Sequence, residues 1–229
     1  MNKFLLADCM NPETGLPSYP DKFFDLAIVD PPYGIGEDGG KQRTRGSKAT
    51  NGQKKGWDKR PPTAQYFEQL FRVSKNQIIW GANHFINLMP YASPCWVSWD
   101  KLDDGSDFAD FELAWTSFKT SAKIYRQSRQ SNQNHITRPR IHPTQKPVAL
   151  YRWLLENYAK PGDLILDTHV GSASSLIACE QMGFEYHAFE LDPDYYEAAQ
   201  NRMSKGIQTN LFAHGTNAPQ NRDEQITLF

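Results

Sequence analysis

Short apolar runs that each end in an acidic residue constrain the fold most. The run over residues 24–30 is followed by two prolines, and the run over residues 164–167 is followed by a loop of small residues. Near-continuous apolar runs of this length are typical of buried parallel strands. A third run, over residues 186–190, comes after the helix-like segment 174–182 and its capping residue Gly183. The order strand, helix, strand predicts parallel strands in a layered sheet.

Five further segments extend this alternation. The expected strands cover residues 77–80 and 95–99, and the expected helices cover residues 63–73, 147–159 and 193–204. The last helix has Asp192 as its N-cap, Pro193 at its first position and Gly206 just past its end. We therefore expect one α/β domain over residues 1–206, followed by a flexible tail over residues 207–229.

Positive charge gathers in two stretches although the formal net charge is only −1. Residues 34–56 are typical of a mobile basic loop, and residues 113–155 contain no acidic side chain before Glu156. Each stretch fits either an ordinary solvated loop or a surface for a polyanion such as DNA. The candidate DNA-binding residues are Lys41, Arg43, Arg45, Lys54, Lys55, Lys119, Lys123, Arg126, Arg129, Arg138 and Arg140.

Cysteine spacing and hydropathy bear on the location of the protein. Cys9, Cys95 and Cys179 lie far apart and form no C-x-x-C pair. This spacing predicts neither a disulfide framework nor a bound metal, and it favours a reducing, cytoplasmic location. No run of about 18 apolar residues occurs, so neither membrane insertion nor export is expected.

The acidic end of the first run continues into the tetrapeptide Asp30-Pro31-Pro32-Tyr33. The two prolines stiffen this turn and remove amide donors, which leaves the Asp30 carboxylate and the Pro31 carbonyl as acceptors. Two fixed acceptors that bind the N–H groups of an exocyclic amine favour the pyramidal, nucleophilic form of its nitrogen. Tyr33 is suited to stack on a base that has left the duplex. These four residues are the predicted catalytic residues, and a proline-rich turn without a function is the alternative.

A second motif follows the strand expected over residues 164–167. Asp167 is followed by Gly171, Ser172 and Ala173, and small residues at a strand-to-helix turn let a ligand approach the backbone. Glu190 ends the next expected strand, and an acid about 20 residues after such a turn accepts the hydroxyls of a ribose. The pair predicts a nucleotide-type site, and a tight structural turn is the alternative.

A third motif, His142-Pro143-Thr144-Gln145-Lys146-Pro147, precedes the helix expected over residues 147–159. Thr144 and Lys146 are candidates to hold a carboxylate at the start of that helix, where backbone amides also favour an anion. A lysine considered in isolation, such as Lys146, is more often a surface residue than a ligand-binding one. Its place between the other two motifs favours a role in a site.

In this order, the three motifs and the basic region between them resemble the β-group of DNA amino-methyltransferases over roughly residues 4–203. The resemblance implies a Rossmann-like fold with a mixed, mostly parallel sheet and helices on both faces. It implies S-adenosylmethionine as the cofactor and a target-recognition segment over about residues 100–140. His169 and Ala173 stand where members of this family commonly have Phe and Gly. The cofactor-binding candidates are Asp8, Cys9, Thr144, Lys146, Asp167, Gly171, Ser172, Ala173 and Glu190.

The expected function is transfer of a methyl group to N6 of a flipped adenine in double-stranded DNA, in a bacterial or phage restriction-modification setting. Asp30 before the two prolines favours adenine by habit of the family, and methylation of cytosine N4 is the alternative. A non-catalytic DNA-binding relative and an RNA or protein amino-methyltransferase are further alternatives. The short recognition segment favours a small target site or help from a second subunit in a homodimer.

Two copies of the pattern Gln-x-x-Leu-Phe lie in the expected tail. The pattern at the end of the chain, with Gln225, Leu228 and Phe229, resembles the short peptide that docks on bacterial sliding clamps. The copy at residues 208–212 is expected to pack on the domain instead. An unstructured tail with no partner is the alternative for the terminal copy.

Overall fold

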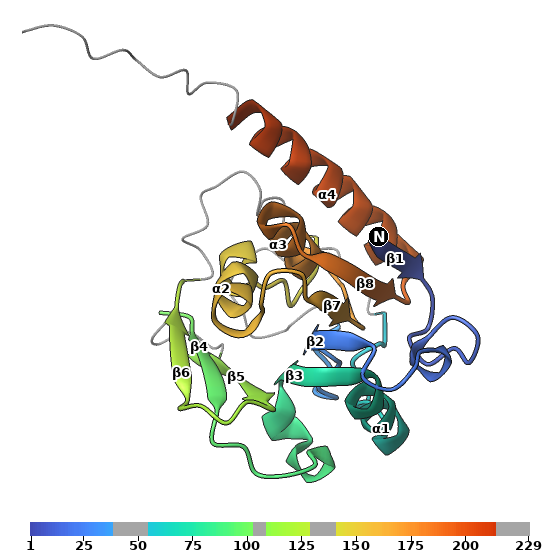
Figure 1. Cartoon of the computed structure of the whole chain (residues 1–229), viewed down its shortest axis with the longest axis vertical. Helices are drawn as coiled ribbons and strands as arrows, with labels where there is room; N and C mark the ends of the chain where they lie inside the picture. Colours follow the sequence, from blue (N-terminus) through green and yellow to red (C-terminus); the bar gives the residue numbers. More distant parts are fainter. Residues whose placement is uncertain (39–54, 103–108, 129–140, 214–229) are drawn as a thin grey trace, which may run out of the picture.

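Among the described residues, an eight-stranded sheet forms the centre of the molecule (Figure 1). The computed structural model describes residues 1–38, 55–102, 109–128 and 141–213. The strands are β1 Lys3–Leu6, β2 Phe24–Val29, β3 Ser74–Trp80, β4 Trp96–Asp100, β5 Phe111–Thr116, β6 Lys123–Arg126, β7 Leu164–Asp167 and β8 Glu185–Glu190. The α-helices are α1 Ala64–Val73, α2 Val148–Tyr158, α3 Ser174–Met182 and α4 Pro193–Ala213, and short 3-10 turns cover Leu16–Ser18, Ala82–His84 and Ile86–Leu88.

The strand order places a topological switch point at the middle of the sheet. The order is β1-β8-β7-β2-β3-β5-β4-β6, and every neighbouring pair is parallel except the two pairs that include β5. From β7 the chain continues through α3 to β8 on one side, whereas from β2 it continues through α1 to β3 on the other. Ligands of open α/β sheets bind outside the carboxyl ends of the strands at such a point. The prediction of a mixed, mostly parallel sheet is confirmed.

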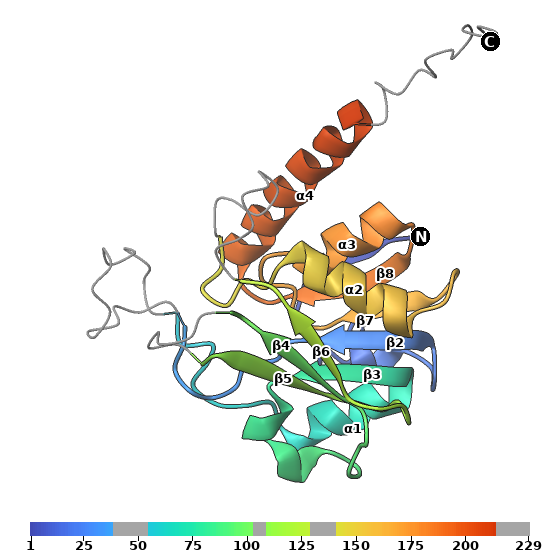
Figure 2. The same ribbon diagram turned by 90° about the vertical axis from the view of Figure 1, so that its left-hand side faces the viewer.

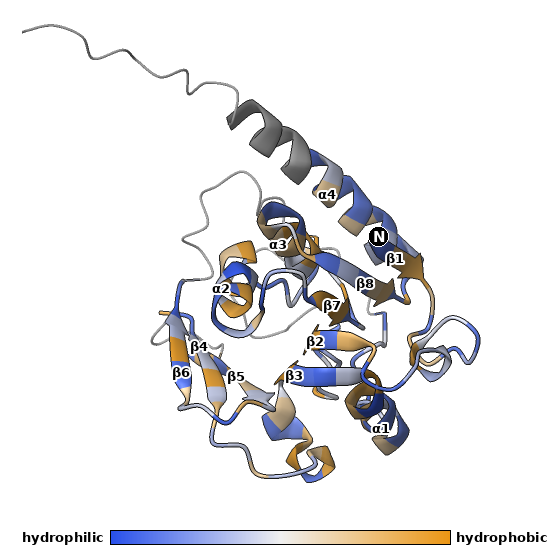
Figure 3. Ribbon diagram, in the orientation of Figure 1, coloured by the Kyte–Doolittle hydropathy of each residue, from blue (hydrophilic) through white to orange (hydrophobic). Residues whose placement is uncertain are grey.

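Helices cover both faces of the sheet, as the resemblance implied (Figure 2). Because strand side chains alternate, Leu26 and Ile28 pack with α2 and α3 in one cluster, while Ala27 and Val29 pack with α1 in another. Strand β7 is hydrophobic, whereas part of β3 and most of the described part of α4 are hydrophilic (Figure 3). The two buried layers hold the carboxyl ends of β2 and β7 side by side.

Strand β5 was not expected from the sequence, which indicated only a polar target-recognition segment over about residues 100–140. Ala114, Trp115 and Thr116 are fully buried, and β5 lies between β3 and β4 inside the sheet. The edge strands β1 and β6 were not expected either. Each of these strands is short or carries polar residues on one face, so its apolar run falls below the length that hydropathy detects.

The start of α4 agrees with the prediction, but its end does not. Asp192 caps the helix, because its Oδ1 accepts the backbone N–H groups of Asp194 at 2.9 Å and Tyr195 at 3.1 Å. The predicted stop at Gly206 is wrong, since α4 continues to Ala213. A glycine inside a helix costs about 1 kcal/mol, which neighbouring residues can offset. The first residues of the expected tail are therefore helical.

Among the described residues, no helix combines the length and the apolar composition needed to cross a bilayer.

Candidate active site

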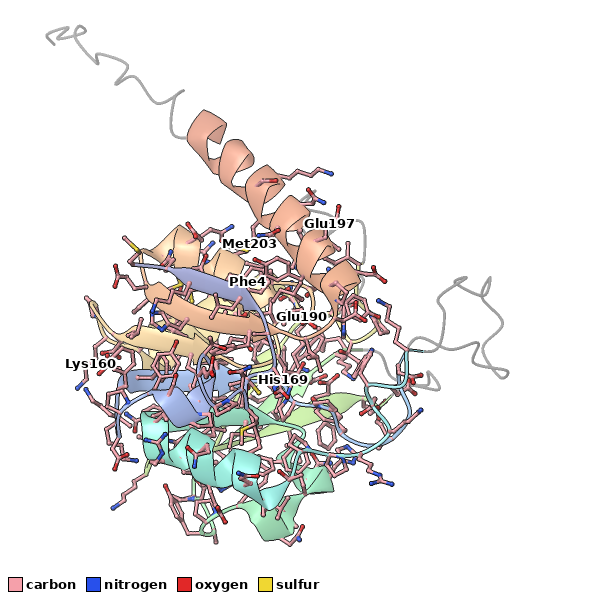
Figure 4. All side chains as sticks on the ribbon, turned by 90° about the vertical axis from the view of Figure 1, so that its right-hand side faces the viewer. Phe4, Lys160, His169, Glu190, Glu197 and Met203 are labelled. Atoms are coloured by element: carbon pink, nitrogen blue, oxygen red, sulfur yellow. The ribbon has the colours of Figure 1, made fainter. Side chains whose placement is uncertain are left out.

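One cavity of about 810 Å³ opens at the carboxyl ends of the central strands. Its wall includes Asp30 and Tyr33 after β2, Thr168 to Ser172 after β7, and Glu190 at the end of β8. Figure 4 shows His169 and Glu190 on this side of the sheet, while Lys160, which precedes β7, lies at the opposite edge. The size is within the range of small-molecule sites. The catalytic and cofactor candidates thus meet in one space.

The predicted catalytic tetrapeptide lies in this cavity with all four residues in its wall. The Tyr33 hydroxyl donates to Asp30 Oδ1 at 2.7 Å, and the Lys146 ammonium donates to Asp30 Oδ2 at 2.5 Å. The ring of Tyr33 stacks on His84, with centroids 5.1 Å apart and an interplanar angle of 16°. The turn therefore presents its carboxylate and its aromatic ring in fixed positions.

Gly81 makes room for the Tyr33 ring. It has a φ of +69°, and a Cβ atom added to it would lie 2.0 Å from Cε1 of Tyr33. No side chain fits there unless Tyr33 moves. Gly81 follows β3 directly, so the end of one central strand shapes the catalytic turn at the end of its neighbour. The sequence analysis did not select this residue, because a lone glycine after a strand has many structural uses.

Lys146 contacts the predicted catalytic turn, Asp30–Tyr33. Its ammonium lies 2.5 Å from Asp30, 3.0 Å from Glu112 and 3.2 Å from the Tyr33 hydroxyl, so each of its three N–H donors has an acceptor. Its side chain is only 1% exposed. The prediction that Lys146 holds a cofactor carboxylate stays a prediction, and in this structure the ammonium contacts the carboxylates of Asp30 and Glu112. Thr144, its predicted companion, contacts His142 Nδ1 at 3.0 Å instead.

Burial and charge set the ionisation of this cluster. Burial raises the pKa of Asp30, the Lys146 charge opposes that rise, and the charge of Glu112 adds to it. Burial alone would lower the pKa of Lys146, but the carboxylates of Asp30 and Glu112 outweigh burial and raise it. Although burial also acts against the ionised form of Glu112, Lys146 and Lys101 lower its pKa to about 2. Glu112 and Lys146 therefore stay charged at neutral pH.

The second motif forms the other side of the cavity. Glu190 Oε2 accepts the Gly171 N–H at 2.7 Å, and its Oε1 accepts the Asp192 N–H at 2.9 Å. Gly171 has a φ of +54°. Gly171, Ser172 and Glu190, all cofactor-binding candidates, line the cavity. Each Glu190 oxygen retains a second lone pair that can accept a hydroxyl group.

Asp167 and Ala173, two of the cofactor-binding candidates, are buried and are not among the residues that line the cavity. The Asp167 carboxylate is buried behind the loop, where it accepts hydrogen bonds from the His169 amide and the Ser175 hydroxyl. Burial raises its pKa to about 7. Ala173 is fully buried with a φ of +59°, a conformation that glycine adopts more easily. Both residues shape the turn into α3 and do not face the cavity.

His169, which stands at a position where Phe is common, behaves as a neutral aromatic ring. Burial lowers its pKa to about 4, so it is uncharged at neutral pH. Its ring meets Tyr66 edge to face at 5.4 Å, and its Nδ1 lies 2.9 Å from the Thr168 hydroxyl. The replacement of Phe by His thus keeps the aromatic packing.

Asp8 and Cys9, two of the cofactor-binding candidates, follow β1, whose end lies beside Glu190. Strand β1 pairs in parallel with β8, with Leu6 opposite Glu190, and the Ala7 N–H donates to the Glu190 carbonyl at 2.9 Å. Both Asp8 and Cys9 line the cavity. Burial raises the pKa of Cys9 to about 12, so its thiol is protonated and is not a nucleophile.

Four of the candidate DNA-binding residues are described, and they lie in different places. Lys55 pairs with Asp192 at 2.6 Å and Asp194 at 2.7 Å, which ties the chain before Trp57 to the start of α4. Arg126 lies at the end of β6 that faces the cavity side, 3.3 Å from Asp100. Lys119 and Lys123 lie toward the opposite edge of the sheet. The remaining candidates, Lys41, Arg43, Arg45, Lys54, Arg129, Arg138 and Arg140, fall outside the described residues, as do Gln225, Leu228 and Phe229.

The sequence analysis also missed several polar residues in the cavity wall, among them His84, Lys101 and Glu112. Glu112 is a single charged residue between Phe111 and Leu113, whereas Lys101 follows Asp100 and His84 follows Asn83. A charged residue between apolar residues, such as Glu112, indicates a buried charge, and a buried charge requires a partner. The identity of that partner depends on strand order, which no local pattern contains.

Known proteins resemble this chain in sequence and in fold. Residues 48–201 match the family model described as N6/N4-type DNA methylase, a range that begins after the tetrapeptide. YubD of Escherichia coli (strain K12) is 25% identical over 228 residues, which cover 89% of this chain and 91% of YubD. The type II methyltransferase M.HinfI of Haemophilus influenzae is 23% identical over 249 residues, which cover 89% of this chain and 68% of that protein.

Solved structures share the fold. The M1.HpyAVI complex with S-adenosylmethionine has a TM-score of 0.56 at 16% identity, covering 89% of this chain and 99% of that one. The cytosine-N4-specific PvuII DNA methyltransferase has a TM-score of 0.60 at 14% identity, covering 94% of each chain. These structures support the Rossmann-like fold, and the family model matches about two thirds of the sequence. The chain therefore belongs to the N6/N4 family of DNA methylases.

Proposed function

We propose that this protein transfers a methyl group from S-adenosylmethionine to N6 of a flipped adenine in double-stranded DNA. The observation that carries the proposal is the position of the Asp30 carboxylate and the Pro31 carbonyl. Both lie at the end of β2, in the same cavity as the Gly171 loop and Glu190. A base must leave the duplex before its amine can reach such a cavity.

The cavity fits S-adenosylmethionine in chemistry. Glu190 and Asp8 offer carboxylate oxygens to hydroxyl and amine groups, and Gly171 lets the backbone approach a ligand. Several carboxylates line the wall, which favours a cofactor with a positive sulfonium. When bound, the cofactor supplies an electrophilic methyl group. Because the three N–H donors of Lys146 already have acceptors in Asp30, Tyr33 and Glu112, we assign Lys146 to this cluster and not to the cofactor's carboxylate.

The catalytic turn acts on the amine. Asp30 and the Pro31 carbonyl accept its two N–H groups, which localises the lone pair on the nitrogen. Tyr33 supports the base by stacking and keeps its hydroxyl on Asp30. The amine nitrogen would attack in line, so that the new N–C bond forms as the bond between the methyl group and the sulfonium sulfur breaks and a neutral thioether is left. The nitrogen gains positive charge, which the neighbouring Asp30 carboxylate stabilises, and one amine proton then passes to solvent to give the methylated base.

Replacement of Asp30 tests this assignment. We expect Asp30→Ala to lower methyl transfer by roughly 100-fold or more, because one acceptor of the amine is lost. Cofactor affinity, measured by equilibrium titration, should change little. Full activity in Asp30→Ala would contradict the role of the turn.

Methylation of cytosine N4 is the second candidate, because the PvuII enzyme of similar fold is specific for it and the same two acceptors serve either amine. Digestion of DNA methylated by the protein, followed by mass spectrometry of the nucleosides, separates the two. N6-methyladenine is the expected product, and N4-methylcytosine would overturn the proposal for adenine while leaving the roles of the turn intact.

Beyond DNA, docking on a sliding clamp through Gln225, Leu228 and Phe229 and assembly as a homodimer stay predictions from the sequence. The DNA contacts predicted for Lys41, Arg43, Arg45, Lys54, Arg129, Arg138 and Arg140 also stay predictions.

A further inference from the structure

Glu112 lies in the cavity although none of the three sequence motifs contains it. It belongs to β5, the strand that runs antiparallel between β3 and β4. Its Oε1 lies 2.8 Å from the Lys101 ammonium, and its Oε2 lies 3.0 Å from the Lys146 ammonium. The same Oε2 lies 3.4 Å from the Tyr33 hydroxyl. One side chain thus contacts two buried cations and the catalytic tyrosine.

The charges alternate along a chain of contacts from Lys101 through Glu112 and Lys146 to Asp30. The side chains of the two lysines are 6% and 1% exposed, so water cannot replace a lost partner. A buried ammonium requires its hydrogen bonds to be satisfied. Without the Glu112 charge, Asp30 would be the only carboxylate that the described residues place within 4.0 Å of Lys146. The ammonium would then bind Asp30 more strongly.

We propose that Glu112 is a positioning residue for methyl transfer, which holds Lys146 between two carboxylates so that Asp30 remains an effective acceptor for the target amine. This inference rests on the proposed function of Asp30. Glu112 itself does not contact the reacting atoms. Its effect passes through Lys146 and Tyr33.

The charge of Glu112 also bears on the pH dependence of Asp30. The titratable groups that face Asp30 are Tyr33 in its own turn, Lys146 before α2, Glu112 on β5, Tyr151 on α2 and Asp167 at the end of β7. Of these, Glu112 raises the pKa of Asp30 and Lys146 lowers it. Removal of the Glu112 charge therefore lowers the pKa of Asp30 and makes its carboxylate less basic.

Glu112→Gln removes the charge and keeps the shape. Single-turnover methylation of DNA would be measured against pH in the wild type, in Glu112→Gln and in Asp110→Asn, an equal charge change at an exposed residue of the same segment. In Glu112→Gln we expect a rate about tenfold or more lower and an acid limb moved down by roughly one pH unit. Asp110→Asn should match the wild type. Cofactor affinity, measured by titration, should be unchanged in both variants.

A double variant guards against misfolding. Lys101→Met combined with Glu112→Gln removes two opposite charges, which buried sites tolerate better than the loss of one, so it should be more stable than Glu112→Gln. Because Lys146 still lacks its second carboxylate in the double variant, the acid limb should stay moved down as in Glu112→Gln. Acid limbs that coincide in wild type and Glu112→Gln, or cofactor affinity that falls as much as the rate, would overturn the inference. If the wild type methylates no DNA, the proposed function fails instead, whatever Glu112 does.

Discussion

The Lys146 ammonium links three side chains of the cavity wall. Its three N–H donors are directed to Asp30, Glu112 and Tyr33, and none is left for a ligand. Removal of one partner from such a buried ion pair typically costs about 3–5 kcal/mol, because the remaining charge is uncompensated. The conformation of the turn Asp30–Tyr33 is therefore coupled to the residues that surround Lys146. Glu190 does not take part in this cluster and instead binds the Gly171 N–H.

Asp167 gives a prediction for stability against pH. Its pKa is raised to about 7 in the folded protein from an ordinary value of 3.8. The protonated carboxyl stabilises the fold, an effect fully present below 3.8 and lost as the pH rises through about 7. Asp167→Asn removes the charge, keeps an oxygen that accepts the His169 N–H, and places an NH2 donor opposite the Ser175 hydroxyl, which can accept it. The free energy of unfolding of the wild type should therefore fall with pH, relative to the variant, by up to about 1.4 kcal/mol per pH unit in that window.

Urea denaturation at several pH values between about 4.5 and 7.5 measures this difference. Asp110→Asn, at an exposed residue, is the control and should follow the wild type. Parallel curves for wild type and Asp167→Asn would show that Asp167 ionises normally in the folded protein.

The residues that sequence could identify are those whose role is local. Asp30 and Glu190 each end an apolar run and sit beside a characteristic turn, so their place at the carboxyl end of a strand follows from the pattern. Glu112 and Lys101 meet only because β4 and β5 are neighbours in the sheet. The partner of Lys146 likewise comes from β2, 116 positions away. Long-range contacts of this kind have no signature in one sequence.

At the scale of elements, the end of β3 determines where the catalytic turn can lie. Gly81→Ala would place a Cβ atom 2.0 Å from the Tyr33 ring, so the ring must move. Because a displacement of about 1 Å can lower a rate by roughly 100-fold, we expect a loss of that order in single-turnover methylation. Cofactor affinity should change little, since Gly81 lies away from the Gly171 loop in the strand order.

Gly183→Ala is the matched control for that variant. Gly183 ends α3 with a φ of +75°, similar to that of Gly81, and no atom lies within 4 Å of an added Cβ. The substitution therefore introduces backbone strain of about 1–2 kcal/mol without a clash. It should lower thermal stability and leave the methylation rate near that of the wild type. Equal losses of activity in the two variants would attribute the effect to strain and not to Tyr33.

Elements with strong local signals were predicted almost to the residue. Helix α3 runs from Ser174 to Met182 with Gly183 as its cap, as expected, because an apolar segment and a positive-φ glycine both mark it. Strand β5 and the last two turns of α4 were missed for opposite reasons. Strand β5 is buried by its neighbours despite a weak pattern, whereas Gly206 is a stop signal that the helix overrides.

At the scale of the whole molecule, the sheet separates basic residues that the sequence grouped together. Arg126 and Lys123 lie at opposite ends of β6, and only Arg126 faces the edge at which the cavity opens. A duplex that delivers a base to Asp30 must approach that edge. Arg126 is paired with Asp100 and its side chain is 60% exposed, so it remains accessible to a phosphate.

Arg126→Ala should therefore weaken DNA binding for all sequences and reduce the slope of log K against log salt by about 1, the contribution of one phosphate contact. Lys123→Ala removes the same charge from the far end of the same strand and should leave both affinity and slope unchanged. Fluorescence anisotropy of a labelled duplex over a series of salt concentrations measures both. If Lys123→Ala lowers the slope as much as Arg126→Ala does, DNA reaches beyond the cavity edge, and the recognition surface must include β6 along its whole length.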